Sequence, residues 1–285
     1  LKLVDIAGIG RGASEGEGLG NTFLSHIRTV DAVLHVVRCF EDPNVVHVDG
    51  SVNPTRDKEI IDMELAFKDM ETLEKRADRL RKLAKGQDKE VLRQLALCEA
   101  IIKHLEDEKP ARSFDGLETE DDHKFFKELM LLTGKPVIYV CNIDEASVNT
   151  GNEHTARFIE SVKAENAQII YISAAIEAEI SELESPEERQ MFLDDMNLTE
   201  PGVNKVITAC YNILDLITYF TAGEKEVRAW TIRRGMKAPQ AAGVIHTDFE
   251  RGFIKARTVS FGDFIKYKGW KGAQENGVMR QEGKE

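Results

Sequence analysis

Short runs of apolar residues recur within residues 1–215 and are separated by longer, more polar stretches. The runs span residues 1–8, 32–37, 137–141 and 169–172. Runs of this length, ended by glycine or polar residues, are typical of strands that are buried in a sheet. The hydrophobic pattern therefore predicts four buried strands. It also directs attention to the polar residues that follow each one.

Residues 55–130 have a different pattern, with apolar residues at the spacings of three and four that are typical of amphipathic helices. One stripe consists of Ile60, Met63, Phe67, Met70, Leu73, Ala77 and Leu80, and a second consists of Val91, Leu95, Cys98, Ile102 and Leu105. The stretch Lys85-Gly86-Gln87-Asp88 predicts a turn between them, so we expect an antiparallel helical hairpin. The charged residues interpreted as the solvent-facing side of the first helix include Lys68, Asp69, Glu71, Glu74, Lys75 and Arg76.

The first apolar run ends in Asp5-Ile6-Ala7-Gly8, the D-x-x-G pattern of P-loop nucleotide hydrolases. In those proteins the aspartate reaches the Mg²⁺ shell and the glycine amide faces the γ-phosphate. The pattern is common by chance, but a glycine-rich stretch, residues 10–20, follows it directly. Such a stretch suits a switch that orders around a phosphate, and a plain flexible loop is the alternative. Asp5 is therefore a candidate metal residue and Gly8 a candidate catalytic residue.

Asn142-Ile143-Asp144-Glu145 follows the third run, where a P-loop GTPase carries Asn-Lys-x-Asp. The GTPase aspartate accepts two hydrogen bonds from guanine, and here that position holds Glu145. The glutamate side chain is one methylene longer than aspartate, so its carboxylate cannot keep the geometry of these two hydrogen bonds. In addition, the ring N1 of adenine is a hydrogen-bond acceptor, whereas that of guanine is a donor. We therefore interpret Asn142, Asp144 and Glu145 as nucleotide-binding residues in a site that favours ATP.

Ser173, Ala174 and Ala175 close the fourth run, where GTPases place a small-residue loop beside the base. This signal has low specificity by itself, and it gains weight from the order of the motifs along the chain. In a doubly wound sheet, the nucleotide crevice opens where strands end. The three residues are therefore candidate nucleotide-binding residues.

Several stretches together closely resemble the YchF family of Obg-related ATPases. They are Asp5-Ile6-Ala7-Gly8, residues 11–21, residues 35–41, Asn142-Ile143-Asp144-Glu145, and Phe220-Thr221-Ala222-Gly223 through residues 238–243. The resemblance runs over essentially all 285 residues. It implies an α/β fold with three parts. These are a P-loop domain with a doubly wound sheet (residues 1–54 and 131–215), an inserted antiparallel helical hairpin (55–130), and a small β-rich, ubiquitin-like TGS domain (216–285).

The resemblance also implies an activity: hydrolysis of ATP in preference to GTP, and a link to ribosomes or translation. Mg²⁺ is the expected cofactor, with K⁺ as a further candidate ion. The family's phosphate loop, G-x-x-x-x-G-K-[ST], should precede the D-x-x-G strand, and the sequence contains no such motif. We therefore expect the 285 residues to be part of a longer protein, to lack a central strand and the last TGS strand, and to be inactive alone.

Catalysis requires a group that orients the attacking water. Ras-type GTPases use a glutamine directly after D-x-x-G, and here that position holds Ile9, which has no hydrogen-bonding group. The family resemblance points instead to His47, in the loop of residues 45–50, whose imidazole can orient or deprotonate water near neutral pH. An ordinary loop histidine is the alternative interpretation. His35, inside the second apolar run, is predicted to be structural.

The net charge of −12 is unevenly distributed. Residues 216–285 hold 13 Lys and Arg against 8 Asp and Glu, whereas the remaining residues hold 25 against 42. A basic module attracts phosphate backbones, so the C-terminal part is the candidate surface for ribosomal RNA. Arg233, Arg234 and Lys237, on the turn predicted after a strand at 227–232, are the expected contacts.

The composition also bears on membrane association and on the state of the cysteines. No run approaches the roughly 18 apolar residues of a membrane span, and we expect a cytoplasmic protein with neither a membrane nor a DNA partner. The four cysteines have no metal-binding spacing and are predicted to be buried, reduced thiols. Three functional classes stay open: an ATPase switch, a ribosome-associated GTPase, and a ribosome- or RNA-binding protein without enzymatic activity.

Overall fold

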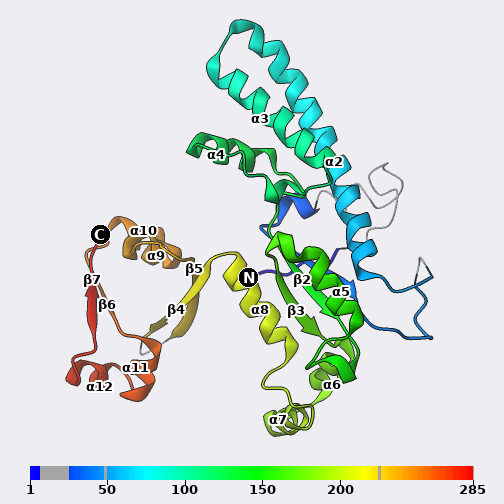
Figure 1. Ribbon diagram of the computed structural model, residues 1–285. Helices are drawn as coiled ribbons and strands as arrows, with labels where there is room; N and C mark the ends of the chain where they lie inside the picture. Colours follow the sequence, from blue (N-terminus) through cyan, green and yellow to red (C-terminus); the bar gives the residue numbers. More distant parts are fainter. Residues whose placement is uncertain (7–25, 48–49, 224–225, 285) are drawn as a thin grey trace. The chain divides into compact units, whose positions relative to one another are not determined.

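The structure, a computed structural model, describes residues 1–6, 26–47, 50–223 and 226–284 (Figure 1). The chain divides into two compact units, Leu1–Ile213 and Leu214–Glu285. Among the described residues, no helix combines the length and apolar character that a membrane crossing needs. The four cysteines, Cys39, Cys98, Cys141 and Cys210, are free and buried, as predicted.

The first unit contains a parallel sheet of three described strands in the order β1-β2-β3 (Figure 1). The strands are β1 (Val33–Arg38), β2 (Val137–Asn142) and β3 (Gln168–Ile172). The central strand, β2, is buried at every position except its last. Burial on both faces explains why this run is apolar without alternation. These three strands match the predicted runs to within one residue at the end of each.

Helices cover both faces of the sheet. On one face, Tyr139 packs against Phe158 with their ring centroids 5.2 Å apart, and on the other, Ile138 packs in a cluster with Ala209. Adjacent residues of β2 thus serve opposite faces, as the alternation of side chains along a strand requires. The helices that supply these contacts are α5 (Glu153–Val162) and α8 (Gly202–Ile213). This is a doubly wound α/β arrangement.

The prediction of a strand at residues 1–8 is wrong for the described residues 1–6. They form no strand, and Leu1, Leu3 and Val4 are exposed. A strand needs a neighbour for its backbone N–H and C=O groups, and none of the described strands pairs with this stretch. Ile6 is partly buried, where it packs against the cluster around Ile27.

Between β1 and β2, the described residues form three α-helices, and the first two lie side by side as a hairpin (Figure 1). They are α2 (Pro54–Leu83), α3 (Lys89–Glu106) and α4 (Glu120–Leu129). The first helix begins where the Asn53 side chain accepts a hydrogen bond from the Arg56 N–H and proline occupies the first position. The second begins at Asp88, whose side chain caps the N–H of Glu90. The turn lies where the sequence predicts it.

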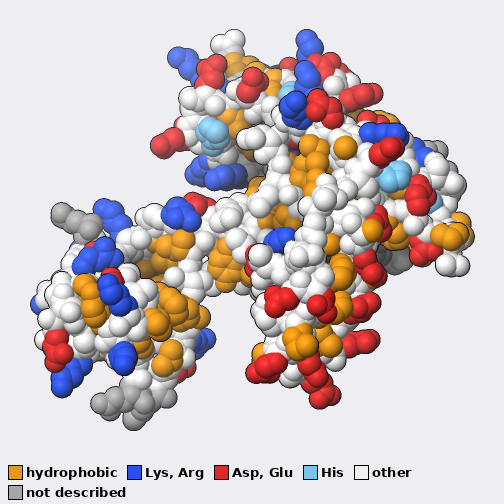
Figure 2. All heavy atoms as spheres, turned by 60° about the horizontal axis from the view of Figure 1, so that its bottom comes forward, with side chains coloured by type: hydrophobic (Ala, Val, Ile, Leu, Met, Phe, Trp, Pro, Cys, Tyr) orange, Lys and Arg blue, Asp and Glu red, His pale blue; other side chains and the backbone are white. Residues whose placement is uncertain are grey.

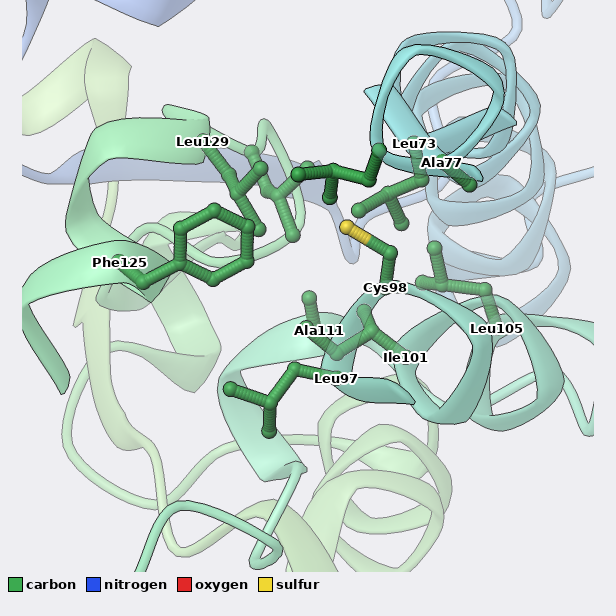
Figure 3. Packing of buried hydrophobic residues seen from close by; sticks show 11 residues of the cluster. Leu73, Ala77, Leu97, Cys98, Ile101, Leu105, Ala111, Phe125 and Leu129 are labelled. Carbon is green, nitrogen blue, oxygen red and sulfur yellow. The ribbon is translucent and has the colours of Figure 1, made fainter. Parts of the chain in front are cut away.

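A separate hydrophobic core holds the three helices together (Figure 3). Leu73 and Ala77 of α2 face Cys98 and Ile101 of α3, and Phe125 of α4 closes the cluster. All five are buried. At roughly 25 cal/mol per Å² of apolar surface, burial of this kind is the main stabilising contribution to such a helical unit.

The predicted apolar stripe of α2 is wrong in its first half. Met63 and Phe67 are 51% and 50% exposed, and the buried positions there are instead Leu65 and Asp69. Asp69, interpreted from its charge as solvent-facing, is fully buried. Its carboxylate accepts hydrogen bonds from the N–H groups of Leu132 and Thr133 at 2.7 and 2.8 Å. The aspartate therefore caps the backbone that leads into β2.

Replacing Asp69 with alanine is expected to lower the free energy of unfolding by about 3 kcal/mol, because two buried N–H donors would lose their acceptor. Urea denaturation followed by circular dichroism measures the loss. Asp78→Ala, at an exposed acid on the same helix, is the matched control and should cost less than about 0.5 kcal/mol. Equal losses for the two variants would contradict the anchoring role of Asp69.

A largely but not fully buried polar cluster joins the base of α2 to the sheet. Arg112 and the Tyr139 hydroxyl donate to Glu165 at 2.8 and 2.7 Å, and Lys58 of α2 contacts the same carboxylate. Burial alone would raise the pKa of Glu165, but hydrogen bonds from Arg112, Lys58 and Tyr139 hold it below its usual value. His35 packs nearby against Tyr139, with ring centroids 5.7 Å apart, and burial lowers its pKa. These contacts support the structural role predicted for His35.

The remaining elements complete both units. In the first unit they include α6 (Ala174–Glu182), α7 (Pro186–Asp195) and the short 3₁₀ helices η2 (Ala84–Gly86), η3 (Ala111–Ser113) and η5 (Lys163–Glu165). In the second they are β4 (Leu216–Ala222), β5 (Val227–Arg233), α9 (Ala238–Ile245), α10 (Thr247–Arg251), β6 (Ala256–Thr258), α11 (Phe261–Lys266), α12 (Trp270–Glu275) and β7 (Arg280–Glu282). Here β4 pairs with β5 and β6 pairs with β7, both antiparallel.

Candidate nucleotide site and basic turn

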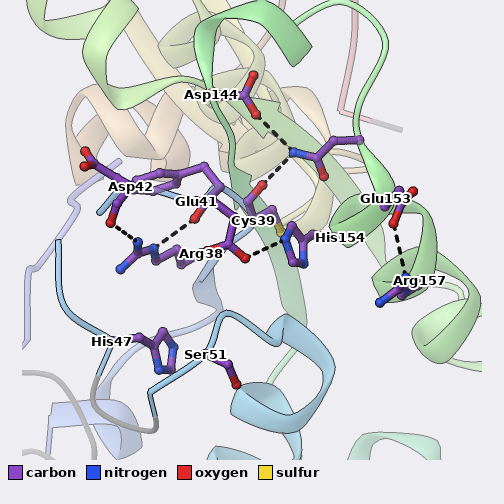
Figure 4. A network of polar contacts seen from close by, with 12 residues as sticks. Arg38, Cys39, Glu41, Asp42, His47, Ser51, Asp144, Glu153, His154 and Arg157 are labelled. Carbon is purple, nitrogen blue, oxygen red and sulfur yellow. Dashed lines mark hydrogen bonds and ion pairs between the residues drawn. The ribbon is translucent and has the colours of Figure 1, made fainter. Parts of the chain in front are cut away.

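The carboxyl ends of β1, β2 and β3 lie at one edge of the sheet, because the three strands are parallel. The loops that leave this edge carry most of the predicted site residues of the first unit. In doubly wound sheets, ligands bind outside the carboxyl ends of the strands. This edge is therefore the candidate nucleotide site (Figure 4).

Two of the predicted motifs are directly bonded to each other. Asn142, the last residue of β2, accepts a hydrogen bond through Oδ1 from the N–H of Ala174 at 3.1 Å. Ser173 is buried and begins α6, with its hydroxyl accepting from the N–H of Ile176. Ala175 follows, exposed, in the first turn of that helix. Asn142 thus joins the loop after β2 to the loop after β3.

The carboxylate of Asp144 accepts hydrogen bonds that stabilise its own loop. They come from the N–H and hydroxyl of Ser147, both at 3.0 Å, and from Nδ2 of Asn152 at 3.2 Å. Partial burial alone would raise the pKa of Asp144, but the hydrogen bonds from Ser147 and Asn152 lower it. Glu145, by contrast, is exposed at the start of the short 3₁₀ helix η4 (Glu145–Ser147). Of the two carboxylates in this motif, that of Glu145 is the more exposed to solvent.

Asn152 is a residue that sequence reasoning missed. Besides contacting Asp144, its Nδ2 donates to the carbonyl oxygen of Cys39 at 2.7 Å, which links the loops after β1 and β2. Asn152 also caps α5 reciprocally with Thr155. That capping pattern, asparagine three residues before threonine, is the sequence signal that could have drawn attention to it.

Arg38 shapes the loop that follows β1. Its guanidinium donates to the carbonyl oxygens of Phe40 and Val45 at 3.1 and 2.9 Å and lies 4.6 Å from the centroid of the Phe40 ring. Figure 4 shows the loop continuing from Arg38 to His47. His47 is mostly buried, and its Nε2 lies 2.9 Å from Oδ2 of Asp57 in the first turn of α2. The described residues 38–47 therefore make contacts both beside the sheet and with the first turn of α2.

Asp5 is exposed, and the described residues include no group of three or more His, Cys, Asp or Glu side chains arranged to hold a metal ion. A nucleotide-bound Mg²⁺ does not require such a cage, because the phosphates and water supply most of its ligands and the protein only one or two carboxylates. A single accessible aspartate fits that mode. Gly8, Ile9 and the glycine-rich stretch lie outside the described residues.

The basic residues predicted in the second unit lie on one turn. Arg233 ends β5, Arg234 and Gly235 follow it, and Lys237 precedes α9. Gly235 has a φ of 82°, the left-handed conformation that glycine adopts without strain. All three basic side chains are exposed, and Arg234 pairs with Asp215 at 3.1 Å. In Figure 2, Lys and Arg side chains are spread between hydrophobic ones on the visible face of this unit.

Comparison with known proteins identifies the family. The chain is 52% identical over 287 residues to the "Ribosome-binding ATPase YchF" of Bacillus subtilis, covering 100% of this chain and 78% of that protein. The Escherichia coli protein of the same name is 48% identical over 285 residues, covering 100% and 77%. The chain belongs to the YchF family. The resemblance inferred from the motifs is thereby confirmed.

A solved YchF structure and two family models agree with this assignment. The structure of the Schizosaccharomyces pombe YchF GTPase matches with a TM-score of 0.83 and 38% identity, over 94% of this chain and 72% of that one. A family model described as "50S ribosome-binding GTPase" matches residues 1–72. The YchF GTPase C-terminal model, described as "Protein of unknown function (DUF933)", matches residues 216–285. A P-loop GTPase-like α/β fold is therefore established, and the YchF C-terminal model covers the basic turn.

Proposed function

We propose that the full-length protein is a cytoplasmic, ribosome-associated nucleotide hydrolase that uses ATP in preference to GTP. The names of its B. subtilis and E. coli relatives, both ribosome-binding ATPases, support ribosome association and ATP hydrolysis. The single observation that carries the choice of ATP is the exposed Glu145 at the edge of the sheet, in the position where GTPases read guanine with aspartate.

In this proposal the site residues have separate roles. Asn142 holds the loop of Ser173, Ala174 and Ala175 beside the base, and Asp144 shapes the loop that presents Glu145. His47 orients the attacking water, and the Gly8 amide faces the γ-phosphate. Asp5 contributes to the shell of Mg²⁺, which would neutralise charge on the phosphates when bound. K⁺ remains a candidate second ion.

We further propose that the three parts inferred from the sequence act as domains: a nucleotide domain (1–54 and 131–215), a helical hairpin (55–130) and a TGS domain (216–285). The separate core of the hairpin and the division of the chain at residue 214 support these boundaries. The TGS domain is proposed to contact ribosomal RNA through Arg233, Arg234 and Lys237.

Glu145→Asp tests the choice of nucleotide. In the full-length protein we expect ATP to bind more tightly than GTP, and the substitution to shift the ratio of dissociation constants toward GTP by about 1 to 3 kcal/mol, the value of a pair of buried hydrogen bonds. Competition of both nucleotides against a fluorescent analogue measures the ratio. Glu153→Asp, at another exposed glutamate, the first residue of α5, should leave this ratio unchanged. Equal affinities in the unaltered protein would refute the ATP preference.

A GTPase is the second candidate function, because both the family model over residues 1–72 and the S. pombe structure are described as GTPases. This candidate shares the site residues of the first and differs in the role of Glu145. The same competition experiment separates the two functions. Tighter binding of GTP than ATP by the unaltered protein would favour the GTPase.

A further inference from the structure

Glu145 extends from a short turn, so the place of its carboxylate depends on how that turn is held. It is exposed and is the first residue of η4. A group that reads one edge of a base must be held to within about half an ångström by the residues around it. The contacts that fix this turn are therefore expected to affect the choice of base.

Asp144 holds the turn at its start. Its carboxylate accepts hydrogen bonds from both the N–H and the hydroxyl of Ser147, which closes η4. The N–H of Gly151 donates to the carbonyl oxygen of Ser147 at 2.7 Å and turns the chain back. This return of the chain places Asn152 beside Asp144.

The side-chain amide of Asn152 bridges this turn to the end of β1. Its Nδ2 donates to Oδ2 of Asp144 at 3.2 Å and to the carbonyl oxygen of Cys39 at 2.7 Å. Its Oδ1 accepts from the N–H of Thr155 at 3.0 Å. An amide has donors on one atom and acceptor positions on the other, so it can make all three contacts. A carboxylate of the same shape could accept from Thr155, but it could not donate.

Cys39 is itself fixed to the strand that carries the motif. Its N–H donates to the carbonyl oxygen of Asn142 at 2.8 Å, just beyond the last pair in the register of β1 and β2. The carbonyl oxygen of the same buried residue then accepts from Asn152. The Asn152 amide thus continues the contact between the two strand ends beyond the backbone ladder. It ties the turn of Glu145 to Asn142, which also holds Ala174.

We propose that Asn152 is a positioning residue for base selection: by bridging Asp144 to the end of β1, it holds the turn where Glu145 can discriminate ATP from GTP. The proposal rests on the role of Glu145 in the proposed function. The bridge ends one residue before Glu145 in the chain, whereas Asp5 and His47, which are proposed to act at the phosphates and the water, belong to other segments. Loss of the bridge should therefore change nucleotide affinity and selectivity and leave the chemical step intact.

Asn152→Asp in the full-length protein tests the bridge. Aspartate is as good an N-cap as asparagine, but it cannot donate, and it would place a carboxylate against Asp144. We expect the Kd for ATP to rise by at least about 10-fold, the scale of a lost hydrogen bond to a charged group. The ratio of the GTP Kd to the ATP Kd should fall toward one, while kcat at saturating ATP stays within about 2-fold. Competition against a fluorescent analogue measures both dissociation constants, and phosphate release measures kcat.

A second variant, Asn152→Ser, tests the bridge without adding a charge. Serine also caps a helix, but its side chain is too short to reach both acceptors. It should shift the ratio in the same direction by a smaller factor, and it decides the question if the aspartate variant does not fold. Ser185→Ala is the matched control, because Ser185 caps α7 by accepting from the N–H three residues along, as Asn152 caps α5. The control should lower the melting temperature and leave the ratio unchanged. An equal shift of the ratio in Ser185→Ala would overturn the proposal, since stability and not the bridge would then govern the choice of base.

A double variant shows whether Asn152 acts through Glu145. In Glu145→Ala the carboxylate that is to be positioned is gone, so adding Asn152→Asp should leave the ratio of the two dissociation constants unchanged to within about 2-fold. A further shift by the full factor seen for Asn152→Asp alone would overturn the proposal.

Failure of the proposal and failure of the proposed function give different results. If the unaltered protein prefers ATP and Glu145→Asp shifts the ratio, but neither change at Asn152 does, the proposal is overturned and the role of Glu145 stands. If the unaltered protein binds ATP and GTP equally, the choice of nucleotide in the proposed function fails, and the proposal fails with it.

Discussion

Replacing His47 with alanine in the full-length protein is expected to lower the turnover number for ATP by about 100-fold or more, within the range for general acid–base groups. ATP affinity should stay nearly unchanged, because in the proposed function the imidazole acts on the attacking water and not on the nucleotide. The expected pattern is an equal fall in kcat and in kcat/KM, which indicates loss of an interaction made only in the transition state. Phosphate release under steady-state conditions measures the turnover number, and a direct binding measurement determines the ATP affinity.

The control for this experiment is another histidine of the same unit. His123 is exposed on α4 and has no part in the loop between β1 and α2, so His123→Ala should retain full turnover. Unaltered turnover in His47→Ala would show that His47 is an ordinary loop residue and has no catalytic role. A variant that loses ATP binding as well as turnover would indicate that the substitution has disturbed the nucleotide site.

The sequence predicted the sheet well because burial on both faces leaves a plain signal. Every residue of β2 up to Cys141 is buried, so the run is apolar throughout. The run predicted as a strand at residues 1–8 contains Lys2 and Asp5, and its described part, residues 1–6, forms no strand. Whether a strand forms there depends on a neighbour for its backbone, and the composition of a run carries no information about its neighbours.

The hairpin shows a second limit of prediction from the hydrophobic pattern. The spacing of three and four found both helices and the turn between them, but it placed Met63 and Phe67 inside and Asp69 outside. In the first half of α2, Leu65 packs with Ile27 and Leu132, whereas in the second half Leu73 and Ala77 pack against α3, so the buried side shifts along the helix. Asp69 is buried because the backbone at Leu132 and Thr133 supplies its donors. These partners are more than 60 residues away in the chain, where periodicity cannot find them.

The candidate site, too, was predicted only in part. The motifs located the loops after β2 and β3, because each follows directly from a recognisable strand. The contacts that organise the loops after β1 and β2 were not predicted, since Asn152 meets the carbonyl oxygen of Cys39, and Asp57 meets His47, only in the folded chain. Each does occupy the beginning of a helix. Capping patterns just after a motif-bearing strand are therefore the local signal by which such residues can be sought.

Reversing the charge of the basic turn in the second unit is expected to abolish co-sedimentation with ribosomes at moderate salt. Each Lys or Arg that neutralises a phosphate releases condensed counterion, so binding through this turn must weaken steeply as salt rises. Arg233 and Lys237 are exposed at the two ends of the turn. Arg234 is bonded to Asp215, and a glutamate there would face a like charge. The variant that follows from the structure is therefore Arg233→Glu, Arg234→Gln, Lys237→Glu.

ATPase activity should persist in this variant, because the nucleotide site is built from the first unit. The matched control makes the same change in charge at the tip of the hairpin, with Lys82→Glu, Lys85→Glu and Lys89→Gln, three exposed positions. The control should still co-sediment, and its affinity should keep the salt dependence of the unaltered protein. Equal loss of binding in both variants would mean that overall charge, and not the turn, governs the association. Two results would contradict the proposal: binding that survives the change at the turn, and binding of the unaltered protein that does not depend on salt. Either would mean that the second unit does not bind the ribosome through phosphates and that its positive charge acts only on solubility.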